Sequence, residues 1–399
     1  MSTKTLTGIL EWPERAEGRI RQLGEDATLT EHPDDPFVPV AFAQEYPLRH
    51  GLEVTVEVGE RRPRRRRRGR QAGPRSTRPV VESFVAIEGM DPQAFKSRAP
   101  FEELTSIDPQ PRLTLEYPGC PPACRLIDLF CPIGRGQRAL IVSPPKAGKT
   151  TLLKDMGRAV LVNHPQVKVF FLLVDERPEE VTDFRRSFAR PNRNGEWDHP
   201  WSPQRVAVIA SSNDHDVERH IQISLLTLER CKRMVEAGQH VVVFLDSLTR
   251  LGRAFNRSRR HASSGRTMTG GIDSKALEVP KTIFGAARNT EEGGSLTIIA
   301  TCLVDTGSQG DQVIFEEFKG TGNMELILDR RVAEKRLFPA MDLAGSGTRK
   351  EELLLDSKAL QTITALRRRM MTMPPPQQVE QLLAAMQRFP TNAALVGSD

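Results

Sequence analysis

A glycine- and lysine-containing loop that joins an apolar run to a helical pattern is the most constraining feature of this sequence. The apolar run at residues 139–142 is followed by Ser-Pro-Pro-Lys-Ala-Gly-Lys-Thr at 143–150, and a helical pattern comes next. Such a loop presents backbone N–H groups to a phosphate at the helix N-terminus. Gly148 permits the close approach, Lys149 neutralises phosphate charge and Thr150 can reach Mg²⁺. The sequence therefore predicts a phosphate-binding loop.

Unbroken apolar runs alternate with helical segments over the C-terminal two thirds of the chain. Runs rich in β-branched residues, without polar alternation, are typical of parallel strands buried on both faces. The helical segments between them, such as 217–237, supply the crossovers of an α/β fold. After about residue 360 one or two closing helices are expected. The expected strands are residues 139–142, 167–174, 206–210, 241–245, 296–303 and 324–328.

Two carboxylates follow predicted strands of this sheet. Asp246 closes the run 241–245, and Glu176 follows the run 167–174. Because ligands bind beyond the carboxyl ends of parallel strands, Asp246 is interpreted as the acid that holds the Mg²⁺ shell. Glu176 is interpreted as the base that orients and deprotonates an attacking water. Either acid alone could instead cap the next helix, but together with the phosphate loop they favour phosphoryl chemistry.

Seven longer motifs follow one another between about Leu126 and Leu355. They are residues 144–150, 174–182, 246–251, 284–289, 291–301, 316–326 and 346–353. In this order they resemble the motifs of the bacterial transcription termination factor Rho family. The resemblance implies a RecA-like P-loop ATPase with ATP and Mg²⁺ as cofactors. It further implies a homohexameric ring that binds RNA in its central channel and acts on the RNA polymerase elongation complex.

The resemblance also implies roles for residues around the nucleotide. The catalytic residues would be Glu176, Lys149, Asp246, Arg250 and Arg349, and the Mg²⁺ ligands Thr150 and Asp246. Arg349 would act across the subunit interface as an arginine finger. The ATP-binding residues would be Gly134, Arg135, Gly136, Gln137, Arg138, Ala139, Lys146, Ala147, Gly148, Lys149, Thr150, Thr151, Arg177 and Phe338.

Two residues of the nucleotide site depart from the expected pattern. Ser143 stands where the general phosphate loop has glycine, and Thr151 stands where the family has a methionine beside adenine. The adenine would therefore lose one apolar wall, although Phe338 remains to stack on it.

Two loops and the N-terminal domain would contact RNA if the resemblance holds. In the first loop, 257–270, Arg266 replaces a lysine and Thr267 an aliphatic residue; in the second, 305–311, Gln309 replaces a lysine. The positive charges that contact RNA phosphates would then lie mainly in the first loop rather than the second. The alternative is that the first loop is only solvated and does not contact RNA. The RNA-binding residues would be Glu17, Arg19, Arg21, Phe37, Arg266, Thr267, Met268, Thr269, Gly270, Gly271, Gln309 and Lys319.

The N-terminal region predicts a small all-β barrel, of the OB or cold-shock-like kind that the resemblance implies. Its short β-prone runs, separated by Gly, Pro and charged clusters, are residues 5–10, 37–42, 52–58 and 80–87. Glu17 and Arg19 stand where the family has base-stacking aromatics, and Phe37 alone keeps one. Base stacking by this domain is therefore expected to be weakened or lost.

The positive charge of the chain is concentrated in one segment. The formal net charge is +6, while residues 61–70 alone contain eight arginines. Such a run is expected to form a basic loop that binds phosphates without regard to sequence, or else a solvated spacer.

Composition excludes several other classes of protein. No apolar run approaches the length of about 18 residues that a membrane span needs, and the N-terminus lacks the apolar stretch of a secretory signal. We therefore expect a cytoplasmic protein with no membrane partner.

Five cysteines, an odd number, argue against a disulfide framework. Cys120, Cys124 and Cys131 lack a fourth ligand at zinc spacing, which argues against a zinc site.

The expected organisation is a barrel at 1–90, a connector at 91–125 and an ATPase domain at 126–399.

The resemblance implies an ATP-dependent RNA translocase and RNA–DNA helicase that terminates transcription. Two other functions compete with it. A Rho-like RNA-binding regulator or paralogue with a slow or uncoupled motor would explain the altered RNA contacts. A rotary ATPase subunit would share the phosphate loop but would not explain residues 284–289 and 346–353.

An insertion at 188–203 contains Trp197 and Trp201. These tryptophans either form a surface for a partner or pack over the edge of the sheet.

Deleting residues 61–70 is expected to lower RNA affinity and to make its dependence on salt concentration shallower, because fewer counterions are released on binding. Filter binding of a single-stranded RNA at several salt concentrations measures both quantities. An unchanged salt slope would identify the segment as a spacer.

Overall fold

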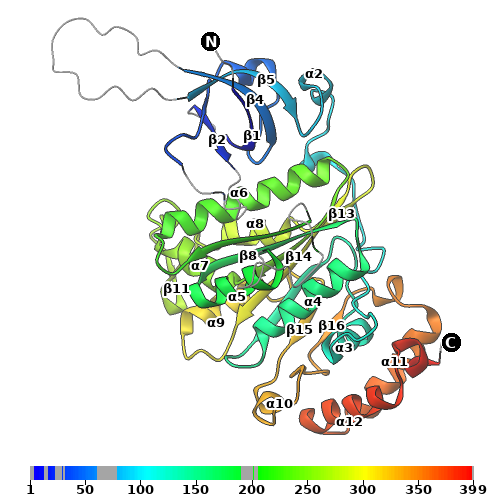
Figure 1. Cartoon of the computed structure of the whole chain (residues 1–399). Coiled ribbons are helices and arrows are strands. Elements are labelled where there is room, and N and C mark those ends of the chain that lie inside the picture. The colour runs from blue at the N-terminus through cyan, green and yellow to red at the C-terminus, as the bar shows by residue number, and fades with distance from the viewer. Residues whose placement is uncertain are drawn as a thin grey trace, which may run out of the picture.

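A computed structural model describes residues 4–12, 17–22, 29, 32–60, 79–189, 201 and 205–397 of the chain. A small β-barrel lies at one end of the molecule, a large α/β domain forms its centre, and a group of C-terminal helices lies at the opposite end (Figure 1). The arginine-rich segment 61–70 and Trp197 fall outside the described residues.

Five strands close the N-terminal barrel in the order β1-β2-β3-β5-β4, which confirms the predicted all-β domain. Its core is made of aliphatic side chains such as Leu10, Val54 and Val56. The predicted run 37–42 is a strand only over its first two residues, because Pro39 has no N–H for the ladder. The elements are β1 (Lys4–Glu11), β2 (Gly18–Gln22), β3 (Phe37–Val38), the short helix α1 (Phe42–Glu45), β4 (Glu53–Glu60) and β5 (Pro79–Ile87).

A buried ion pair lies inside the barrel. Arg21, only 1% exposed, donates from Nη1 to Asp35 Oδ2 at 3.0 Å and from Nη2 to Glu11. The other carboxylate oxygen of Glu11 accepts a hydrogen bond from Gln222 at 2.6 Å, on a helix of the large domain. Arg21 therefore links the barrel interior to the large domain.

The large domain is built on a sheet whose six central strands are parallel, in the order β15-β7-β14-β10-β8-β9. This confirms the predicted α/β fold and all six predicted strands. Alternate residues of each strand enter two different cores: Val242 and Phe244 of β10 face one, Val241 and Val243 the other. The strands are β7 (Arg138–Ser143), β8 (Val167–Glu176), β9 (Val206–Ser212), β10 (His240–Asp246), β14 (Ser295–Leu303) and β15 (Met324–Ile327).

Helices cover both faces of this sheet. One face packs against α3 (Pro122–Phe130), α4 (Lys149–Asn163) and α5 (Pro178–Phe188), and Trp201 packs against the same core. The other face packs against α6 (Val217–Glu236), α7 (Leu248–Arg257), α8 (Glu278–Gly285) and α9 (Gln309–Phe318). Burial on both faces explains why the strands carry unbroken apolar runs.

The region 91–125, expected to be a connector, contains α2 (Pro92–Phe95), a 3₁₀ turn (Phe101–Glu103) and β6 (Ser106–Ile107). β6 pairs with β13 (Arg288–Thr290), so this segment joins the edge of the sheet. The remaining short elements are β11 (Thr267–Met268), a 3₁₀ turn (Thr269–Gly271), β12 (Ile272–Asp273), α10 (Arg330–Glu334), β16 (Gly347–Thr348) and a 3₁₀ turn (Glu351–Leu353).

Three helices close the chain, where one or two were expected: α11 (Ser357–Met370), α12 (Pro375–Arg388) and α13 (Asn392–Val396). The prolines at 375 and 376 occupy the first turn of α12, where a missing N–H costs nothing. Across the described residues, no helix has the length and apolar character that a membrane crossing requires.

Charged side chains fix the barrel on α6. Arg230 contacts Glu88 at 2.6 Å and Glu53 at 3.1 Å, and Arg49 contacts Glu236 at 3.1 Å. These contacts hold the barrel on the helix that covers the sheet (Figure 1).

Replacing Arg21 with alanine leaves the carboxylates of Asp35 and Glu11 without their counter-charge. We expect Arg21→Ala to destabilise the barrel by about 3 kcal/mol or more. Hydrogen exchange of β1 and β4 peptides, followed by mass spectrometry, should accelerate about a hundredfold. Arg19→Ala, at a half-buried neighbouring position, is the control. Equal exchange in the two variants would contradict a structural role for Arg21.

Candidate nucleotide site and basic loops

The phosphate loop connects the end of β7 to the start of α4, as predicted. Gly148 caps the helix with φ 89°, a left-handed conformation that favours glycine, and no side chain caps the first amides of α4. A Cβ on Gly148 would also lie 3.2 Å from the ring of Phe338. The uncapped amides at this helix end are available to an anion.

Lys149 lies between the two predicted carboxylates. Its Nζ is 2.5 Å from Asp246 Oδ1 and 3.6 Å from Glu176 Oε1. Thr301 donates to the same Asp246 oxygen at 2.8 Å from the neighbouring strand β14. The structure therefore brings the phosphate loop and both strand-end acids into one cluster, because β7, β14, β10 and β8 are successive parallel strands.

Burial shapes the charges of this cluster. Burial, with a smaller contribution from the nearby Asp246, raises the pKa of the Glu176 carboxyl to about 7, while Lys149 and Arg250 oppose the shift. Burial alone would lower the pKa of Lys149, but Asp246 and Glu176 outweigh it and raise that pKa. A carboxyl that titrates near neutral pH is well suited to accept a proton from water.

Arg250 holds Glu176 in place. Its Nη2 is 3.3 Å from Glu176 Oε2, and its Nη1 donates to the backbone carbonyl of Asp175. Arg250 therefore contacts the candidate base directly.

The residues present fit a divalent cation. Asp246 Oδ2 and Glu176 Oε1 are buried oxygens with no hydrogen-bond partner among the described residues. Oxygen ligands of this kind suit Mg²⁺, and buried acceptors without partners are costly in its absence. Thr150 lies in the first turn of α4, beside Lys149. Asp246 and Thr150 are the residues that would hold Mg²⁺.

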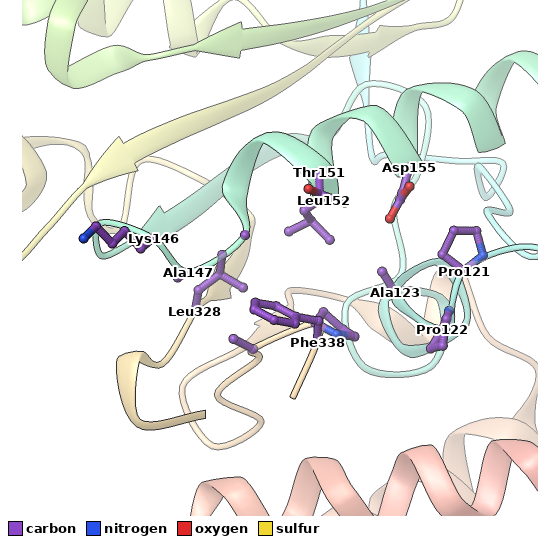
Figure 2. A pocket seen from close by; sticks show the side chains of 13 residues that line it. Pro121, Pro122, Ala123, Lys146, Ala147, Thr151, Leu152, Asp155, Leu328 and Phe338 are labelled. Atoms are coloured by element: carbon purple, nitrogen blue, oxygen red, sulfur yellow. The ribbon is translucent and has the colours of Figure 1, made fainter. Parts of the chain in front are cut away.

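A cavity of about 320 Å³ lies beside the phosphate loop. Phe338, 42% exposed, lies below α4 in Figure 2, with Thr151 and Leu152 on the helix above it. An aromatic ring facing an apolar helix surface suits a planar base. The cavity also has a wall that sequence reasoning missed: Pro121, Pro122 and Ala123 at the start of α3. No nucleotide motif includes these residues, and only the packing of α3 beside α4 brings them to the cavity.

Several predicted ATP-binding residues are not brought to this cavity. Residues 134–138 precede or begin β7, whereas the phosphate loop follows its other end. Their polar groups make contacts inside the domain: the Gly136 amide donates to Thr297 at 2.8 Å, and Gln137 to Asn323 at 2.6 Å. Ala139, the next residue, is fully buried in the core of the sheet.

Two predicted arginines lie at the surface. Arg177 is exposed directly after Glu176, at the start of α5. Arg349 is exposed after β16, and its guanidinium contacts the carbonyl of Gly320 at 3.5 Å. β16 lies at the end of the sheet beyond β15, away from β8 and β10. Arg349 is thus not part of the cluster around Lys149 in the same chain.

The two predicted RNA loops lie against each other. A Cβ on Gly270 would lie 2.6 Å from the backbone nitrogen of Gly310, so these backbones touch. Arg253 on α7 pairs with Asp311 on α9 and holds the helices that carry the loops. The first loop exposes Arg259, Arg260 and Arg266, whereas the second exposes the neutral Gln309.

The other residues predicted to contact RNA lie either in the large domain or in the barrel. Thr267, Thr269, Gly270, Gly271 and Lys319 are exposed and Met268 is half-buried. In the barrel, the guanidinium carbon of Arg19 lies 5.1 Å from the centre of the Phe37 ring, Glu17 is exposed, and Arg21 is the buried residue described above.

The large domain is similar to the nucleotide-binding domains of known ATPases. Residues 123–348 match the nucleotide-binding domain of the ATP synthase alpha/beta family. An ATPase from the type III secretion system of pathogenic bacteria has a similar solved structure, with a TM-score of 0.58 over 80% of this chain and 86% of that one. At 22% sequence identity, this likeness supports the fold alone.

Relatives of higher identity are termination factors. Transcription termination factor Rho of Borreliella burgdorferi is 51% identical over 78% of this chain and 57% of its own length. Rho of Rhodopirellula baltica is 44% identical over 92% of this chain and 66% of its own length. Rho of Streptomyces coelicolor is 42% identical over 98% of this chain and 84% of its own length. The chain thus spans less than two thirds of the first two relatives.

The raised pKa of Glu176 predicts how stability depends on pH. Since the pKa is about 7 in the folded chain and 4.5 ordinarily, the stability due to this carboxyl is present at low pH and lost as pH rises through 7. The variant Glu176→Gln stays neutral and should stabilise the nucleotide-free protein by about 2 to 3 kcal/mol at pH 8. At pH 5 the gain should fall below about 1 kcal/mol. Calorimetric unfolding at both pH values measures this difference.

The control is Glu179→Gln, at an exposed position on α5, which should change stability by less than about 0.5 kcal/mol at either pH. A gain of the same size at both pH values would mean that packing, rather than charge, distinguishes the Glu176 variant.

Proposed function

The chain belongs to the transcription termination factor Rho family, and we propose that it is an ATP-dependent RNA translocase and RNA–DNA helicase that releases RNA from RNA polymerase. The observation that carries the proposal is the buried cluster of Lys149, Glu176 and Asp246 at the phosphate loop. A protein that only bound RNA would gain nothing from three desolvated charges at this place.

Hydrolysis follows from the roles of these residues. The α4 amides and Lys149 bind the phosphates and neutralise their charge, while Phe338 stacks on the base. Glu176 accepts a proton as the water oxygen attacks the γ-phosphorus and the bond to the ADP oxygen breaks. Mg²⁺, when bound by Asp246 and Thr150, supplies charge neutralisation for the phosphate oxygens.

A homohexamer would complete the site. Arg349 is exposed and lies away from Lys149 in its own chain, which supports a role at the site of a neighbouring subunit. A guanidinium there would stabilise the charge that develops on the transferred phosphoryl group. We propose that this assembly acts in the cytoplasm on the RNA polymerase elongation complex, without a membrane partner.

Among the described residues, those that would bind RNA most strongly are the arginines of the first loop. Arg259, Arg260 and Arg266 are exposed there, while Gln309 supplies no charge from the second loop. Phosphate contacts of this kind are insensitive to base sequence and weaken with salt. In the barrel, the Arg19 guanidinium already covers Phe37, so a base would have to displace it or stack on it.

The second candidate is a Rho-like RNA-binding regulator or paralogue with a slow or uncoupled motor. The Arg19–Phe37 contact and the neutral Gln309 favour it, because both alter RNA contacts while leaving the nucleotide cluster intact. A rotary ATPase subunit is not favoured, since relatives of 42% to 51% identity are termination factors.

ATP hydrolysis by the purified chain, with and without poly(C) or mixed RNAs at two salt concentrations, separates these candidates. We expect stimulation by many RNAs, lost at high salt. The variant Lys149→Ala should reduce the stimulated rate by about a hundredfold or more, because the phosphates lose their cation in the water-excluded site. The matched control is Lys154→Ala on the same helix, whose side chain pairs with Asp183 at 2.7 Å. RNA binding without any stimulation would favour the regulator.

A further inference from the structure

One acidic side chain lines the base cavity without a protein partner. Asp155 lies one turn beyond Thr151 on α4, and its carboxylate points down from the helix toward Ala123 (Figure 2). Among the described residues, this carboxylate makes no hydrogen bond and no ion pair, since the neighbouring Lys154 pairs with Asp183 instead. Burial raises the pKa of Asp155, against the weaker influence of Arg158 and Lys154. The cavity therefore holds an acceptor that is still open to a ligand.

The position of Asp155 matches the far edge of a bound base. It follows Lys149 by six residues, which is about 9 Å along the helix axis. The phosphates belong at the start of this helix and the base belongs over Phe338, between the two ends of the cavity. A base stacked on Phe338 would thus present the edge remote from the phosphates to Asp155.

No other charged side chain lines this end of the cavity among the described residues. Of its thirteen lining residues only Lys146 and Asp155 are charged, and Lys146 belongs to the phosphate loop. The walls near Asp155 are Pro121, Pro122, Ala123 and Leu152, which are apolar. Hydrogen bonds to a carboxylate are stronger in such surroundings than in water, and their absence costs more.

The acceptor-only chemistry of a carboxylate favours one purine. Guanine presents two adjacent donors, N1–H and the N2 amine, which a carboxylate can accept together. Adenine presents only its N6 amine beside N1, a lone-pair acceptor that a carboxylate repels. An asparagine at the same position would suit adenine, since it both accepts and donates.

We propose that Asp155 sets the base preference of this site by accepting the N1–H and N2–H donors of guanine. The inference rests on the proposed nucleotide-hydrolysing function and goes beyond it by naming a residue that selects the base. Asp155 contacts the base and not the reacting phosphates.

Calorimetric titration of the full chain with GDP, IDP and ADP tests this role without requiring turnover. IDP keeps N1–H but lacks the N2 amine, so the difference in affinity between GDP and IDP isolates one hydrogen bond to Asp155. GDP should bind about tenfold more tightly than IDP, as expected for a hydrogen bond to a charged group. In Asp155→Ala the ratio should fall below about twofold, and in Asp155→Asn the preference should move toward ADP.

The control is Asp183→Asn on α5. It removes an exposed acid that pairs with Lys154, the neighbour of Asp155 on α4, and it should leave the ratio of GDP to IDP affinity unchanged. Thermal unfolding checks that the Asp155 variants remain folded, and the isosteric Asp155→Asn keeps the test valid if the alanine variant does not. Nucleotide binding with the same GDP to IDP ratio in wild type, Asp155→Ala and Asp155→Asn would overturn the role of Asp155 alone. Failure to bind any of the three nucleotides would overturn the nucleotide site itself and this inference with it.

Discussion

The ion cluster of Lys149, Glu176 and Asp246 is the interaction on which the nucleotide site depends. All three charges are largely buried: Asp246 and Glu176 end the adjacent parallel strands β10 and β8, and Lys149 begins α4. Burial, with a smaller contribution from Asp246, raises the pKa of the Glu176 carboxyl, although Lys149 and Arg250 oppose the shift. Such a cluster lowers the stability of the folded chain, because its charges are buried. It suits a site that binds the phosphates of a nucleotide together with a metal ion.

The chain path connects this cluster to the basic loop. β10 ends at Asp246, α7 follows at once, and the loop with the exposed arginines begins where α7 ends. Arg250 on the first turn of α7 contacts Glu176, while Arg253 one turn later pairs with Asp311 on α9. A single ten-residue helix thus contacts the candidate base at one end and supports both candidate RNA loops at the other.

The barrel shows how a sequence pattern can mislead about the role of a charged residue. In the sequence, Arg21 looks like a phosphate-binding residue on a strand of a nucleic-acid-binding domain. In the structure, its guanidinium is buried and pairs with the carboxylates of Asp35 and Glu11. Arg19, two positions earlier, also faces an aromatic ring rather than open solvent. Among the described residues of the barrel, less charge is therefore available to RNA than the sequence suggests, and the exposed arginines of the loop after α7 gain importance.

Local sequence was enough to predict the α/β fold, the barrel, the phosphate loop and the two strand-end acids. Each depends on a short pattern: unbroken apolar runs for strands buried on both faces, and an acid or a glycine–lysine pair directly after such a run. Tertiary structure alone decided which distant segments share a surface. It brought residues 121–123 beside α4 to complete the base cavity, paired β6 with β13, and left the Asp155 carboxylate in that cavity without a hydrogen-bond partner among the described residues. It also buried Arg21, because side-chain burial depends on packing between segments that no local pattern encodes.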